Sequence, residues 1–179
     1  MRFPINHNNC PGVPINYHPG SFGFKRPWNH HPGVDLYTND GEAIYAIEDG
    51  EVVSRGLFTG PQVGSDWWET TWYVMIEGRS GVFNYGEVYG PTLQVGQKVF
   101  SGDAIASVKR VLFEDKYRPH IPGHSTSMLH LELYERGSTE PVEWLDKKPA
   151  TLLDPTPIIL PLWLKEKPMV NFQFAGINL

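Results

Sequence analysis

Short runs of apolar and β-branched residues alternate with turn sequences rich in Gly, Asn and Asp from Val34 onward. Runs of this length with period-two patterning, separated by turn-forming residues, are typical of β-strands joined by hairpins. The runs that predict strands are residues 34–37, 43–47, 51–54, 71–76, 81–85, 95–99, 104–108 and 128–134. We therefore expect an all-β protein built mainly from antiparallel strands.

The run at residues 128–134 has the clearest pattern. Leu129, Leu131 and Leu133 alternate with polar or larger side chains, among them His130. Because successive side chains of a strand point to opposite faces, the leucines are expected to face the core and His130 the other side.

Three segments lack a sustained period. Residues 1–29 are rich in Pro, Gly and Asn and predict an irregular N-terminal arm, and whether this arm covers a groove is left open. Residues 110–127, which contain His120 and His124, predict a long loop. We expect one core domain over 30–155, with residues 156–179 as a C-terminal extension packed on it.

Composition narrows the function classes. The chain has 179 residues, a formal net charge of −5 and a pI near 5.8, so it has no basic field with which to bind nucleic acid. Cys10 is the single cysteine, which excludes an internal disulfide framework and a multi-cysteine zinc site. No apolar run is long enough to predict a membrane span.

The first residues lack the continuous apolar stretch of a signal peptide. Two histories fit this observation: the protein is made without an export signal, or a signal was removed. We expect a soluble protein, cytoplasmic in the first case and located in the cell envelope or outside the cell in the second. The oligomeric state is left open.

The sequence His31-Pro32-Gly33-Val34-Asp35 contains a candidate metal site. On a straight strand the two polar ends would lie roughly 13 Å apart, so the backbone has to bend for them to share an ion. Gly33 allows that bend, and its missing side chain leaves room for a metal. With His130 the set becomes two imidazoles and one carboxylate, the donor set of a catalytic zinc site with an open position. We expect one zinc ion.

Five phrases in a fixed order carry a resemblance to a known family. They are residues 31–36, 41–50, 95–105, 129–132 and 153–155. In this order the chain, from about residue 24 to residue 155, resembles the lysostaphin/LytM-type zinc endopeptidases. The resemblance implies an antiparallel β-sheet or β-sandwich core with long loops, and zinc held by His31, Asp35 and His130 in a groove. It also implies a substrate among the peptide cross-links of bacterial cell walls, which are often rich in glycine.

The chain departs from the family pattern at two histidines that assist catalysis without binding metal. Glu87 falls where Tyr-x-His-Leu is expected, and Met128 falls where His-x-His is expected. Glu87 is either a general base, as in HExxH metalloproteases, or a strand carboxylate that is exposed or supports His31. Because a methionine cannot donate a hydrogen bond to an oxyanion, His120 and His124 are candidates for that role.

Two functions follow from these residues. The first is a zinc metalloendopeptidase that hydrolyses a peptide bond in peptidoglycan or a related substrate, with Glu87 as base and with Trp67 and Trp68 contacting the substrate. The alternative is a catalytically inactive zinc-binding relative that binds a peptide, a glycan or a protein. The bond that is cleaved is left open.

Overall fold

The larger sheet of the protein is antiparallel, with strand order β1-β8-β5-β4-β3-β6 and with β9 paired to β8. The computed structural model describes residues 1–113 and 127–166. The strands of this sheet are β1 (Val34–Tyr37), β3 (Gly50–Thr59), β4 (Thr71–Gly78), β5 (Val82–Val88), β6 (Lys98–Val99), β8 (Met128–Tyr134) and β9 (Leu152–Leu153). The expected all-β, antiparallel fold is confirmed.

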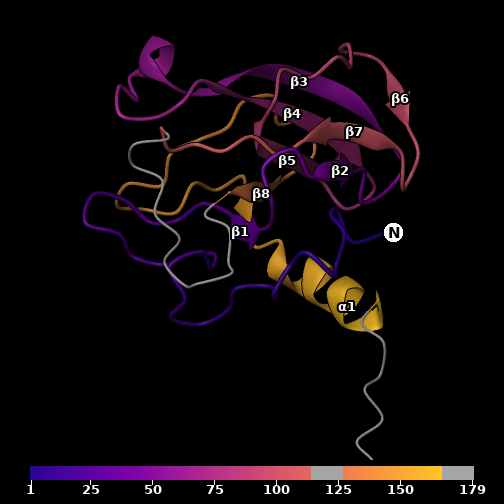
Figure 1. The fold of residues 1–179 in the computed structure, drawn as a ribbon, viewed down its shortest axis with the longest axis horizontal. Coiled ribbons are helices and arrows are strands. Elements are labelled where there is room, and N and C mark those ends of the chain that lie inside the picture. Colours follow the sequence, from indigo (N-terminus) through magenta and orange to yellow (C-terminus); the bar gives the residue numbers. More distant parts are fainter. Residues whose placement is uncertain (114–126, 167–179) are drawn as a thin grey trace, which may run out of the picture.

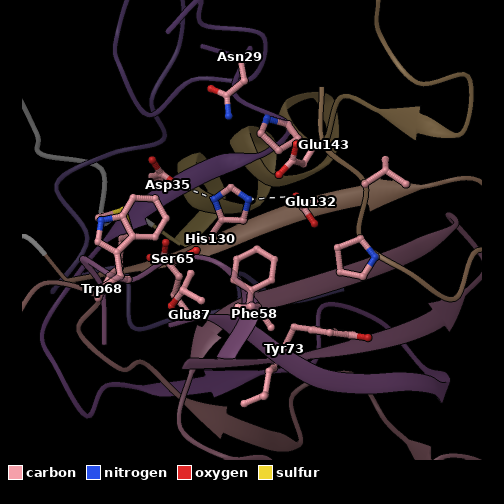
Figure 2. Close-up of a pocket in the computed structure, with 18 of the residues that line it drawn as sticks. Asn29, Asp35, Phe58, Ser65, Trp68, Tyr73, Glu87, His130, Glu132 and Glu143 are labelled. Atoms are coloured by element: carbon pink, nitrogen blue, oxygen red, sulfur yellow. Dashed lines mark hydrogen bonds and ion pairs between the residues drawn. The ribbon is translucent and has the colours of Figure 1, made fainter. Parts of the chain in front are cut away.

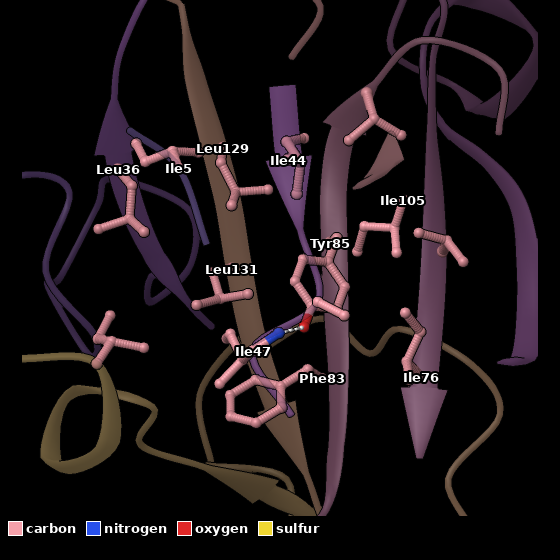
Figure 3. Close-up of a cluster of buried hydrophobic side chains, with 14 of the residues drawn as sticks. Ile5, Leu36, Ile44, Ile47, Ile76, Phe83, Tyr85, Ile105, Leu129 and Leu131 are labelled. Atoms are coloured by element: carbon pink, nitrogen blue, oxygen red, sulfur yellow. Dashed lines mark hydrogen bonds between the residues drawn. The ribbon is translucent and has the colours of Figure 1, made fainter. Parts of the chain in front are cut away.

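A second, two-stranded sheet of β2 (Ala43–Tyr45) and β7 (Ala104–Ser107) lies over part of the larger one (Figure 1). Apolar side chains of both sheets meet in one buried cluster (Figure 3). Within it the Tyr85 hydroxyl accepts a hydrogen bond from the backbone N–H of Ile47 at 3.0 Å. As the alternation predicts, Leu129 and Leu131 of β8 belong to this core.

In the described part of the chain the helical segments are a short 3-10 turn, η1 (Pro61–Val63), between β3 and β4, and one α-helix, α1 (Thr156–Glu166). The helix was not predicted, because Pro161 lies inside it and proline disfavours a helix interior. Its N-terminal N–H groups are capped by Asp154, whose Oδ1 accepts a hydrogen bond from Thr156 N at 2.8 Å. α1 packs against the N-terminal segment (Figure 1), where the Glu166 carboxylate accepts a bond from Phe3 N. Within the described residues, no helix has the length and apolar character needed to cross a membrane.

The pairing of β1 with β8 depends on Gly33, which precedes β1. A Cβ atom at this position would lie 2.5 Å from the backbone oxygen of Leu131, far inside van der Waals contact. Gly33 was expected to leave room for a metal, but the space beside it is filled by the backbone of β8. The glycine therefore allows two strands to approach, and the metal ligands are carried on those strands.

We predict that Gly33→Ala separates β1 from β8 and lowers the free energy of unfolding by about 1–3 kcal/mol, the usual cost of overpacking. Denaturant unfolding measures this change, and zinc binding is expected to be lost with it. Gly90→Ala is the matched control, because a Cβ there meets Trp72 only at ordinary contact distances of 3.7 Å and more. Equal stability of both variants would contradict the packing argument.

Candidate metal centre

Neighbouring strands bring the candidate ligands together. Asp35 of β1 lies directly opposite His130 of β8 in the strand register, and His31 approaches from the segment before β1. All three side chains are buried, and His31 is fully so. His130 lies on the face of β8 opposite the core leucines, as the alternation of the sequence predicts.

The donor atoms converge on one point. His31 Nε2 lies 3.0 Å from Asp35 Oδ1, His130 Nδ1 lies 2.9 Å from the same oxygen, and the two nitrogens are 3.2 Å apart. Zinc bonds of 2.0–2.2 Å in a tetrahedron place donors about 3.3 Å from one another. The triangle of donors therefore fits one face of a zinc coordination sphere after a shift of a few tenths of an ångström, and the donor set suits this metal.

Hydrogen bonds fix which nitrogen of each imidazole is free to bind a metal. His31 Nδ1 donates to the backbone oxygen of Ser21 at 3.0 Å, so Nε2 carries the lone pair. Burial lowers the pKa of His31, which keeps the ring neutral. Burial also opposes charge on His130, but hydrogen bonds to Asp35 and Glu132 outweigh it and raise the pKa of His130 to about 10.

The Asp35 carboxylate stays ionised. Burial opposes its charge, but the neighbouring His31 and His130 side chains hold the pKa of Asp35 well below its usual range. In the metal-free protein, the proton on His130 Nδ1 therefore lies between the lone pairs of Asp35 Oδ1 and His31 Nε2. A divalent cation replaces that proton with a charge that all three donors can bind.

Glu132 orients His130 from the side away from Asp35 (Figure 2). One of its oxygens lies 3.1 Å from His130 Nε2, and the other accepts bonds from Asn84 Nδ2 at 2.5 Å and from the Tyr134 hydroxyl at 2.9 Å. A carboxylate held in this way fixes the ring so that Nδ1 faces the metal position. The period of two in this strand places Glu132 on the same face as His130, which is compatible with this role or with a cross-strand ion pair.

Glu87 reaches the site through a bulge in β5. The register between β4 and β5 shifts here. Tyr73 pairs with Gly86 and Trp72 pairs with Val88, so Glu87 has no paired residue in β4. Its backbone has a φ of 60°, in the left-handed region that residues other than glycine rarely adopt. The bulge changes the phase of the strand, so Val88 enters the core and the Glu87 side chain turns to the pocket.

The Glu87 side chain is buried, and its Oε2 has no hydrogen-bond partner among the described residues. Burial raises the pKa of Glu87 to about 8. The two structural alternatives for this residue find no support, because the side chain is not exposed and both ring nitrogens of His31 face other groups. Strained backbone conformations cluster at functional sites, and so do buried groups with a perturbed pKa. Glu87 has both features.

The ligands open into a pocket of about 660 Å³. Phe58, Trp68 and Tyr73 contribute aromatic side chains to its wall (Figure 2). Met128, the cross-strand partner of Tyr37, also lines the pocket. Trp67 is outside the lining, with 73% of its surface exposed. His120 and His124 lie outside the described residues.

The N-terminal arm contributes a cationic group that the sequence analysis missed. Arg26 Nη2 lies 3.2 Å from Asp35 Oδ2, the oxygen that does not face the histidines. Arg26 also lines the pocket. No spacing in the sequence could indicate this contact, because the arm has no regular structure from which to infer direction.

In the residues that the structure describes, an antiparallel β-sheet carries a His-Asp-His donor set that can hold a divalent metal ion. This combination is that of a β-sheet metalloprotein. The sequence of residues 29–142, more than half of the chain, matches the model of Peptidase family M23. The chain therefore belongs to peptidase family M23, and the resemblance inferred from the sequence is confirmed. No curated protein matches its sequence.

Two solved structures with TM-scores above 0.5 share the fold, and another has a TM-score below 0.5. The catalytic domain of the antimicrobial peptidase lysostaphin from Staphylococcus simulans has a TM-score of 0.51 and 20% identity, covering 86% of this chain and 94% of that one. CbpA from L. salivarius REN has a TM-score of 0.52 and 19% identity, covering 86% and 92%. A zinc-containing peptidase from Vibrio cholerae has a TM-score of 0.48 and 22% identity, covering 79% of this chain, which spans only 38% of that protein.

We predict that zinc binding near neutral pH releases about one proton, because His130 must lose its proton to become a ligand. The zinc dissociation constant should therefore fall about tenfold per pH unit between about pH 7 and pH 9. Titration calorimetry in two buffers of different ionisation enthalpy measures the release. Glu87→Gln is the control, since the release should persist without that carboxyl group, and a pH-independent affinity would contradict the assignment.

The same pKa predicts how stability depends on pH. Since the pKa of folded His130 is raised above the unfolded value, its pairing stabilises the metal-free protein fully below about pH 6.5. That contribution is lost as the pH rises through about 10. Thermal unfolding of the metal-free protein over this interval measures the loss, and a flat profile would contradict it.

We predict that Glu132→Gln weakens zinc binding by about 10–100-fold, because a neutral amide holds His130 less firmly than a carboxylate does. A competition titration against a zinc-chelating dye measures the affinity. The exposed neighbour Glu135→Gln should bind zinc as the wild type does. Unchanged affinity in the Glu132 variant would show that the ring needs no such support.

Proposed function

We propose that this protein is a zinc-dependent endopeptidase that hydrolyses a peptide bond in peptidoglycan or a related substrate, with Glu87 as the general base. The observation that carries the proposal is the buried carboxylate of Glu87, whose Oε2 has no hydrogen-bond partner among the described residues, in the pocket that Asp35 and His130 also line. Membership of a peptidase family supports the reaction class.

In this proposal His31, Asp35 and His130 hold one zinc ion. When bound, zinc lowers the pKa of a water ligand to about 7 and polarises a carbonyl group. The protein supplies the rest. Glu87 accepts a proton from the attacking water while the water oxygen bonds to the carbonyl carbon. The carbon–nitrogen bond then breaks, and Glu87 returns the proton to the leaving amine.

The surroundings of Glu87 suit a group that must accept and release a proton. A general base works best when its pKa is close to the working pH, and burial has moved the pKa of this carboxyl group to about 8. Its Oε2 has no partner among the described residues to compete for the proton. The surrounding packing holds the bulge in place, because a strained backbone persists only where its neighbours determine its conformation.

The pocket suits an extended peptide substrate. Phe58 packs over Gly86, where a Cβ would lie 2.6 Å from the ring, and the same ring is 5.4 Å from the His130 ring. With Trp68 it gives the substrate apolar surface beside the metal position. We infer that Trp67 and Trp68, on the segment between β3 and β4, contact the part of the substrate that extends beyond the pocket.

Residues 30–155 are proposed as the peptidase-like domain, with residues 1–29 as an N-terminal arm and 156–179 as a C-terminal extension. The matched region at 29–142 supports the first boundary. The bond between His31 and Ser21 indicates that the arm also supports the metal ligands.

A zinc-binding protein without catalysis is the second candidate, and the observation that favours it is Met128. This side chain lines the pocket at the position where the family pattern has a histidine, and a thioether cannot donate a hydrogen bond. Zinc content together with the release of new amino groups from purified peptidoglycan separates the two: metal with turnover supports the peptidase, and metal without turnover supports the binding protein.

We predict that Glu87→Gln retains zinc and loses hydrolysis by about 10²–10⁴-fold, because the amide keeps the shape but cannot accept the proton. Amino-group release from peptidoglycan measures turnover, and atomic absorption measures zinc. Glu51→Gln, an exposed carboxylate of β3, is the matched control and should be fully active. Full activity of the Glu87 variant would disprove its role as base.

A further inference from the structure

Arg26 brings a permanent positive charge to the metal centre from outside the sheet. It lies in a tight turn in which Arg26 N donates to Asn29 O at 2.8 Å and Lys25 bridges to His30. Its guanidinium donates to Asp35 Oδ2 at 3.2 Å and to Pro19 O at 3.4 Å. The side chain is thus anchored at one end while 35% of it stays exposed at the pocket.

The charge balance of the pocket makes this residue unusual. Among the described lining residues Arg26 is the only arginine or lysine, whereas four glutamates line the same space: Glu87, Glu132, Glu140 and Glu143. A guanidinium has five N–H donors in a rigid fork. Both bonds above use Nη2, which leaves donors on Nε and Nη1 for a ligand while Nη2 holds Asp35.

Tyr37 adds a second donor on the same side. It is the cross-strand partner of Met128, and it lies two residues after Asp35 on the same face of β1. Its hydroxyl has no hydrogen-bond partner among the described residues, and the ring lines the pocket. The arm holds it there: a Cβ at Gly20 would lie 3.0 Å from the Tyr37 hydroxyl and 3.0 Å from Asp35 Cβ.

Taking the proposed function as given, we propose that Arg26, with the Tyr37 hydroxyl beside it, stabilises the negative charge that develops on the oxygen of the scissile carbonyl. When the water oxygen bonds to the carbonyl carbon, the π electron pair of the carbonyl moves onto its oxygen. That pair returns when the carbon–nitrogen bond breaks. Donors that face this oxygen stabilise the charged state more than the neutral substrate, which accelerates the reaction.

This arrangement supplies the donor that Met128 cannot. A methionine thioether only accepts weak hydrogen bonds, whereas arginine remains protonated at every working pH. The donors come from the strand opposite Met128 and from the arm that packs on it. The imidazole of the family pattern is thereby replaced by donors on the neighbouring strand and on the arm, without a change in the metal ligands.

The test uses zinc-loaded protein and a phosphinate analogue of a glycine dipeptide, whose anionic oxygens mimic the charged carbonyl. Arg26→Gln should keep zinc content and thermal stability, bind the phosphinate about 10²–10³-fold more weakly, and lose kcat by a similar factor at little change in KM. Tyr37→Phe should show the same pattern with a smaller loss, of about tenfold. Lys25→Gln removes the adjacent exposed charge and should leave every value unchanged.

Three results would overturn the assignment. The first is wild-type phosphinate affinity in both the Arg26 and Tyr37 variants. The second is loss of zinc from Arg26→Gln, which would make Arg26 a residue that only positions Asp35. The third is loss of phosphinate binding in a His120→Ala/His124→Ala double variant but not in Arg26→Gln. Arg26-dependent phosphinate binding without any hydrolysis by the wild type would support the anion site and refute the proposed function instead.

Discussion

The contact between β1 and β8 is the constraint on which the rest of the site depends. Their register sets Asp35 opposite His130, and their close approach at Gly33 brings His31 to the same place. A slip of one residue would turn every side chain of β8 to the other face, placing His130 in the core and leucines in the pocket. The core leucines therefore fix the metal site as firmly as the ligands do.

Burial of several carboxylates makes a cation favourable at the candidate metal site. Asp35, Glu87 and Glu132 are all buried around His130, and removing unpaired charges from water is costly. Without a metal, the protonated His130 ring and the Arg26 side chain are the nearby positive groups that the structure describes. These buried carboxylates favour a divalent ion at the shared donor point and keep His130 charged when no ion is bound.

The sequence predicted those parts of the protein in which local pattern and tertiary structure agree. Leucine alternation in 128–134 predicted both the core face and the orientation of His130. The bulge at Glu87 was not predicted, although the sequence contains a signal for it: after Phe83 and Tyr85 the next apolar core residue is Val88, three positions on, rather than a residue at position 87. The helix at 156–166 was hidden by Pro161, and the contact of Arg26 with Asp35 depends on a loop path that no periodicity encodes.

The position of the arm changes how the two departures from the family pattern should be understood. Residues 1–28 lie before the matched region, yet Ser21 fixes the tautomer of His31 and Arg26 contacts Asp35. At Gly20 the arm lies so close to β1 that a Cβ atom would crowd both Asp35 and Tyr37. The arm therefore packs directly against the strand that carries the metal ligand and lies opposite Met128. This close packing is what the proposed set of catalytic groups, with Glu87 and Arg26 in place of the two family histidines, requires.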